Sequence, residues 1–207
     1  MGQIRNPKAP NLPLPGTVYT PTQQAHLNQL LNALRLYFNQ IDSGLQQLLL
    51  GFNHYGAFHD TTTQTIAVIN TAYPVKFNST GEAFGISVAS NSRLTVTRPG
   101  VYSFHFSAQL DNIGGAAHST YLWLRINGTT NLPHSAVKQV ISGTNDEKVV
   151  AVNYLASLEA DDYVELMWSS DSTNTVLAAI AASDSAPVPD IASATAEVTY
   201  VFPNDVA

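Results

Sequence analysis

The chain has 207 residues and no cysteine, so disulfides and thiol chemistry are excluded. Lys and Arg number 9 against 15 Asp and Glu, giving a formal net charge of −6. Only 12% of the residues are charged, about half the usual share for a soluble domain. So little charge favours a protein whose surface is partly covered by partners.

The charge is unevenly spread along the chain. Arg5, Lys8, Arg35 and Asp42 give residues 1–50 a net charge of +2, which leaves −8 for the remainder. A body this acidic argues against a nucleic-acid groove, so no nucleic-acid partner is expected. No apolar run approaches membrane-spanning length, and the first residues lack the apolar stretch of a signal peptide. We therefore expect no membrane partner.

Residues 1–21 are rich in proline, which excludes a helix and favours an extended arm. One interpretation is a disordered tail. The other is an arm that becomes ordered along a partner, because extended proline-rich segments are common ligands of proteins. The anchoring residues on this second interpretation are Arg5, Pro7, Lys8, Pro10, Pro13 and Pro15.

Residues 22–50 are expected to form an amphipathic helix. Thr20 is a suitable N-cap and Pro21 suits the first helical position. Apolar residues then recur at alternating spacings of four and three, which is a heptad pattern. These residues are Leu27, Leu31, Leu34, Phe38, Ile41, Leu45 and Leu48.

The heptad residues predict a short coiled coil that joins copies of the chain. Between Thr22 and Leu50 the only charged residues are Arg35 and Asp42, fewer than a solvated single helix usually has. The alternative is one amphipathic helix packed on its own domain, which the wider apolar stripe from Leu30 would support.

Residues 51–207 read as an all-β jelly roll or sandwich, because short strands alternate with turns and no helix intervenes. The predicted strands are 64–70, 73–78, 85–89, 93–97, 101–110, 120–127, 135–141, 148–158, 162–169, 175–181 and 191–202. "NSTGE" (78–82) and "SGTNDE" (142–147) are among the expected turns.

Two of these strands divide their side chains unevenly between their faces. In 101–110, Tyr102, Phe104 and Phe106 share the core face, while Ser103, His105 and Ser107 share the other. In 148–158 both faces carry apolar residues, and Val149, Ala151 and Leu155 form the second one. A loop or a neighbouring subunit must cover that second face.

The order "LTVTRPGVYSFHFSAQL", "TYLWLRING", "VVAVNYLASLEADDYVELMWSS", "SATAEVTYVF" resembles the tumour-necrosis-factor and complement-globular-head family of trimeric jelly rolls. Asp161 departs from the pattern, since the family often has glycine there. The resemblance implies a homotrimer in which Ser103, His105 and Ser107 face the threefold axis, close to Val149, Ala151 or Leu155. The competing interpretation is that this face is solvated.

The segment "NLPLPGTVYTPTQQAHLNQLLNALRLYFNQIDSG" resembles the opening of virion structural proteins of tailed phages, especially marine ones, through the run Leu34–Gln40. It implies a capsid decoration, cement or head-spike protein located on the virion surface and made in the host cytoplasm. Residues 1–50 would bind the major capsid protein or another virion protein. The alternative is a tail or head fibre whose tip binds a host-surface glycan or protein.

No catalytic or cofactor motif is present, so we expect no enzyme, no cofactor and no metal. Glu159, Asp161 and Asp162 could be imagined as a carboxylate pair, but they lie in a predicted hairpin turn that favours acids on local grounds. Asp111, Asp171 and Asp184 could offer oxygen ligands to calcium, without a coordinating spacing.

Overall fold

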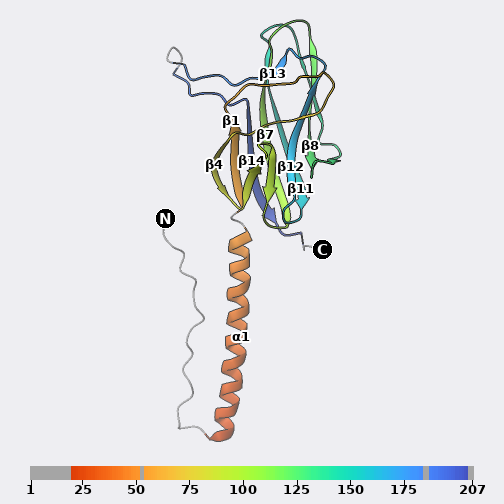
Figure 1. The fold of residues 1–207 in the computed structure, drawn as a ribbon. Coiled ribbons are helices and arrows are strands. Elements are labelled where there is room, and N and C mark those ends of the chain that lie inside the picture. Colours follow the sequence, from red (N-terminus) through yellow and green to blue (C-terminus); the bar gives the residue numbers. More distant parts are fainter. Residues whose placement is uncertain (1–19, 52–53, 184–186, 205–207) are drawn as a thin grey trace. The chain divides into compact units, whose positions relative to one another are not determined.

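The computed structural model describes residues 20–51, 54–183 and 187–204, with residues 46–51 described by their backbone alone. The chain divides into two compact units, Met1–Gly51 and Phe52–Ala207. In the described parts of the chain, the helix lies in the first unit and the strands lie in the second (Figure 1).

Helix α1 (Pro21–Gly51) starts where the sequence predicts. The Thr20 backbone N–H donates to Gln23 Oε1 at 3.0 Å, and the Gln23 N–H donates back to Thr20 Oγ1 at 3.4 Å. This reciprocal pair is a capping box, with Pro21 at the first helical position. The helix continues through Gly44 and is about 46 Å long. Within the described residues, it is too polar to cross a membrane as a helix.

The second unit is a sandwich of two seven-stranded antiparallel sheets. Sheet A contains β1 (Tyr55–Asp60), β2 (Gln64–Thr65), β4 (Ser79–Phe84), β7 (Gly100–Asn112), β11 (Glu147–Leu158), β13 (Thr175–Leu177) and β14 (Ala194–Phe202). Sheet B contains β3 (Tyr73–Pro74), β5 (Ile86–Ala89), β6 (Arg93–Val96), β8 (His118–Ile126), β9 (Thr130–Asn131), β10 (Val137–Ile141) and β12 (Tyr163–Ser170).

The strand order confirms the predicted jelly roll. Sheet A runs β11-β7-β14-β1-β4, with β13 and β2 continuing beside β7, and sheet B runs β10-β8-β12-β6-β5. The chain changes sheet after β2, β3, β4, β6, β7, β10, β11 and β12, so strands that follow one another in sequence mostly lie in opposite layers. That repeated crossing distinguishes a jelly roll from a stack of hairpins.

The core lies between the sheets and is centred on β7. Tyr102 and Phe104 are fully buried and Phe106 is 2% exposed, as the period-two pattern predicts. The facing sheet contributes buried leucines of β8 and β12, together with Trp168. The Tyr102 hydroxyl, buried with its ring, donates to the Arg98 carbonyl at 2.7 Å.

Several strand predictions are wrong. The predicted turn at 78–82 lies mostly within β4, and no strand is predicted where β1 forms. The predicted strands 64–70 and 73–78 shrink to Gln64–Thr65 and Tyr73–Pro74, and 175–181 ends at Leu177. β4 is almost wholly exposed, so it lacks the apolar alternation of a half-buried strand and forms by pairing with β1.

Candidate self-association surfaces

The heptad residues of α1 form an apolar seam that stays open to solvent in the single chain. Phe38 is 37% exposed, Leu34 38%, Ile41 41% and Leu45 47%, while Leu27 and Leu31 are half-buried. The Leu48 side chain lies outside the described residues. An apolar stripe exposed over this length is typical of helices that pair with other helices.

The seam's composition favours three or more helices over two. Leu31, Phe38 and Leu45 occupy the a positions, and parallel dimers prefer β-branched residues there. Leu30 and Tyr37 at the g positions are 56% and 59% exposed, so the apolar face extends beyond the two positions of a narrow seam. A face of this width suits the interior of a bundle.

A second surface is the outer face of sheet A, formed by the side chains that alternate with the core. Cross-strand pairing arranges it in rows: Leu155, Ser103, Thr199 and Tyr55; Asn153, His105, Glu197 and Ala57; Ala151, Ser107, Thr195 and His59. Val149 follows on β11, opposite Gln109. All the sheet residues predicted for a trimer interface therefore lie on one face, although their contact with another subunit stays a prediction.

This face is apolar at the β11 edge and shallowly hollowed in its middle. Val149 is 60% exposed and Leu155 is 55% exposed. Small side chains occupy the middle, where the Ser107 and Thr195 hydroxyls are 2.7 Å apart. A shallow groove there is lined by residues of β7, β11 and β14. β11 is also an edge strand, so its outer main-chain groups lack a strand partner.

His105 has a carboxylate-bearing residue as well as neutral residues beside it in the sheet. Its Nε2 lies 3.2 Å from Ser103 Oγ, and it is paired in register with Glu197 of β14 on one side and Asn153 of β11 on the other. Sequence analysis missed Glu197. The alternation of β14 places it on the polar face, but only the register between strands places it opposite His105.

The acidic turn before β12 is a structural feature rather than a carboxylate pair. Asp162 accepts from the Glu159 backbone N–H at 2.8 Å and from Asn127 Nδ2 at 2.7 Å. Asp161, where the family that the sequence resembles often has glycine, has φ of 69°, the left-handed conformation that glycine adopts most readily. Among the described residues no group of three His, Asp or Glu could hold a metal. Asp184 lies outside them.

One buried carboxylate was also missed, on the outer face of sheet B. Glu165 accepts from Arg125 Nη2 and from Ser92 Oγ, each at 3.0 Å, and Arg93 Nε lies 3.8 Å away. Its side chain is only 5% exposed. These contacts connect β12 to β8 and to the turn before β6. The Glu165 carboxylate therefore has a structural role in sheet B.

The comparisons with known proteins bear on the fold alone. No protein-family model matches the chain, and no curated protein matches it. Among solved structures, the globular domain of zebrafish complement 1qA protein is similar, with a TM-score of 0.48 and 16% identity. The match covers 73% of this chain and 100% of that one. The jelly-roll assignment rests on the strand order of the two sheets.

Proposed function

We propose that the chain is a homotrimeric structural protein, in which α1 forms a three-helix coiled coil and residues 51–207 form the head. The observation that carries this proposal is the exposed heptad seam of α1. Burying such a seam among three helices removes apolar area from water at roughly 25 cal/mol per Å². The outer face of sheet A, with Val149 and Leu155 exposed, provides a second contact in the same trimer.

We place this trimer on a phage virion, as a capsid decoration, cement or head-spike protein. The support is the resemblance of residues 11–44 to the opening of tailed-phage structural proteins. In this arrangement residues 1–50 attach to the major capsid protein or another virion protein, and the heads project. The proposed anchoring residues between Arg5 and Pro15 lie outside the described residues.

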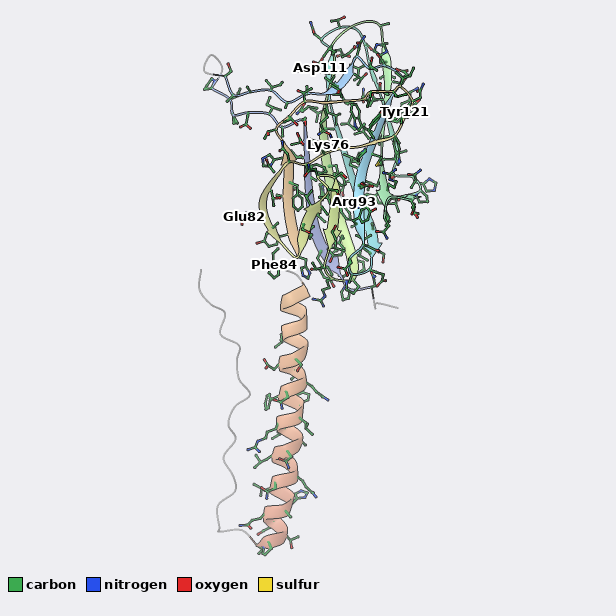
Figure 2. The ribbon with its side chains drawn as sticks, in the orientation of Figure 1. Lys76, Glu82, Phe84, Arg93, Asp111 and Tyr121 are labelled. Atoms are coloured by element: carbon green, nitrogen blue, oxygen red, sulfur yellow. The ribbon has the colours of Figure 1, made fainter. Side chains whose placement is uncertain are left out.

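A second candidate function is the receptor-binding tip of a tail or head fibre. It is favoured by an aromatic surface on the outer face of sheet B. Tyr121 on β8 is 40% exposed, and Lys138 Nζ lies 5.6 Å from its ring centre (Figure 2). Trp123 lies two residues along the same strand, its indole N–H bonded to Asn131 Oδ1 at 2.9 Å. Aromatic rings flanked by polar groups are suited to contacts with glycans or proteins.

Two measurements test the proposal. Sedimentation of the full chain should give about 67 kDa, three times the 22.3 kDa of one chain; a monomer at micromolar concentration would contradict the trimer. Counting copies per particle then separates the two locations, because hundreds indicate a shell component and a handful indicate a tail or vertex.

Attachment is tested by mixing particles that lack this protein with the full chain or with a chain lacking residues 1–50. The full chain should bind and the shortened one should not. Equal binding by both would show that the head, and not the N-terminal region, makes the attachment.

A further inference from the structure

On one side of β7, β13 and β14 pair with successive parts of that strand, and the chain leaves the sheet between them. Leu177 of β13 is opposite Leu110, and Ala194 of β14 is opposite Ala108. The residue between them, Gln109, bonds to both sides of the break: its carbonyl accepts from the Ala178 N–H at 2.8 Å, and its N–H donates to the Ser193 carbonyl at 2.9 Å. The chain therefore leaves and re-enters the sheet at one position. We call the described residues of this segment, 179–183 and 187–192, the arm, which is distinct from the proline-rich residues 1–21.

The arm has a hairpin structure of its own. Ile180 and Ile191 exchange both main-chain hydrogen bonds, at 2.9 and 2.8 Å, and Ser183 bridges to Val188 farther out. At the root, the Ala179 N–H donates to Thr63 Oγ1 at 3.1 Å. Figure 1 shows the described parts of the segment between β13 and β14 extending away from the sandwich. The arm is thus a hairpin that projects from its own domain.

Three large apolar side chains of the arm are exposed. Ile180 is 42% exposed, Val188 is 49% exposed and Ile191 is 36% exposed. Asp190 is its only charged residue among those described, and Asp184 lies outside them. Prolines at 187 and 189 flank Val188 and remove two backbone donors, which opposes open-ended addition of strands to the arm. Recognition must therefore come from the side chains.

The root of the arm belongs to the outer face of sheet A. A groove there is bounded by Asp190, Ile191 and Ala192 of the arm and by outward-facing side chains of β1, β7 and β14, among them His59 and Thr195. A molecule packed on this face must meet the arm. The described part of the arm beyond Ile180 and Ile191 spans roughly 10 Å, about two strand spacings, before the tip is counted.

We propose that the arm of each chain packs against a second copy of this chain, on the outer face of that copy's sheet A, where Val149 and Leu155 are exposed. This inference rests on the proposed function, which places other copies on that face. The exposed isoleucines and valine of the arm would meet the apolar β11 edge of that face, so the contact removes apolar area from water. Asp190 lies at the root of the arm, and Glu197 lies on β14, two strands from the β11 edge. Three such contacts around a threefold axis form a closed ring.

Photo-crosslinking tests the contact directly. Because the chain has no cysteine, a Val188→Cys variant carries a benzophenone label at one site only. The matched control is Val68→Cys, 57% exposed on the segment between β2 and β3. On irradiation of the trimer, the label at position 188 should form a crosslink to a second chain, within peptides of β7, β11 or β14. The label at position 68 should form no such crosslink. A trimer in which the label at 188 joins no second chain overturns the inference.

Charge substitution gives the second test. Val188→Asp should raise the dissociation constant of the full-length trimer about tenfold or more, whereas Val68→Asp should leave it within about twofold. If both variants match the wild type, the arm inference is wrong and the trimer stands. If the wild type is itself a monomer, the proposed function fails and the arm inference fails with it.

Discussion

Replacing Leu34 with alanine tests the seam of α1, and the structure sets the size of the effect. A fully buried leucine side chain contributes about 1.5–3 kcal/mol. Leu34 is still 38% exposed in the single chain, so association can bury at most that fraction, about 0.6–1.1 kcal/mol per chain. Three chains lose about 2–3 kcal/mol together, which weakens the trimer dissociation constant by roughly 30- to 200-fold.

Leu36→Ala is the matched control, because Leu36 lies on the same helix, outside the seam, and is 65% exposed. Both variants change helix propensity by the same amount, so the difference between them isolates the seam. Sedimentation equilibrium over a range of concentrations, at one fixed urea concentration for all three proteins, measures the constants. Equal weakening by both substitutions would refute the reasoning, since the seam would then be no more buried than the opposite face.

Three further outcomes are expected. Burial, and then the positive charge of Arg98, lower the pKa of His54, so the unfolded chain binds more protons and the head loses stability as pH falls through about 6.5; His54→Asn should flatten this loss in urea unfolding between pH 7 and pH 5. Burial, and then Tyr200, raise the pKa of Tyr102 to about 12, so stability should fall by up to about 2–3 kcal/mol between pH 10 and pH 12. Tyr102→Phe should abolish that fall while costing about 1 kcal/mol at pH 7, and an unchanged alkaline profile would exclude Tyr102 as its source. Glu165→Gln leaves partly buried guanidinium groups without their carboxylate and should lower the unfolding free energy by about 2–3 kcal/mol; the exposed substitution Glu159→Gln should change it by less than about 0.5 kcal/mol.

The helix and the central strands were predictable because their signals are local. Thr20 and Pro21 mark the start of α1 by cap chemistry, and the alternation of β7 places Phe104 in the core and His105 outside it. β4 has no such local signal, because its residues are mostly polar and exposed. It forms by pairing with β1, and neither sequence predicts that pairing.

For the candidate surfaces, the sequence predicts which face of a strand each residue occupies, but not which residues of neighbouring strands lie opposite one another. Period two separates Ser103 from Phe104, whereas the position of Glu197 opposite His105 depends on how β14 is aligned with β7. That alignment is set by tertiary packing across the whole sheet. The predicted strands 175–181 and 191–202 failed to show the arm for the same reason, since nothing local to Leu177 indicates that the chain leaves the sheet there.

Gln109 makes main-chain hydrogen bonds to both ends of the break, to Ala178 and to Ser193. The break between β13 and β14 is therefore a suitable position for inserting a foreign peptide into the head. Leu177 and Ala194 both point into the core. The alternation of buried and outward-facing side chains is therefore the same in β13, before the break, and in β14, after it. Whatever sequence joins Ala178 to Ser193, the flanking register is held by one residue of the neighbouring strand. Displayed epitopes, affinity tags or a loop of another length could therefore replace the native segment without shifting β14, whereas the proposed contact of the arm with a second chain would be lost.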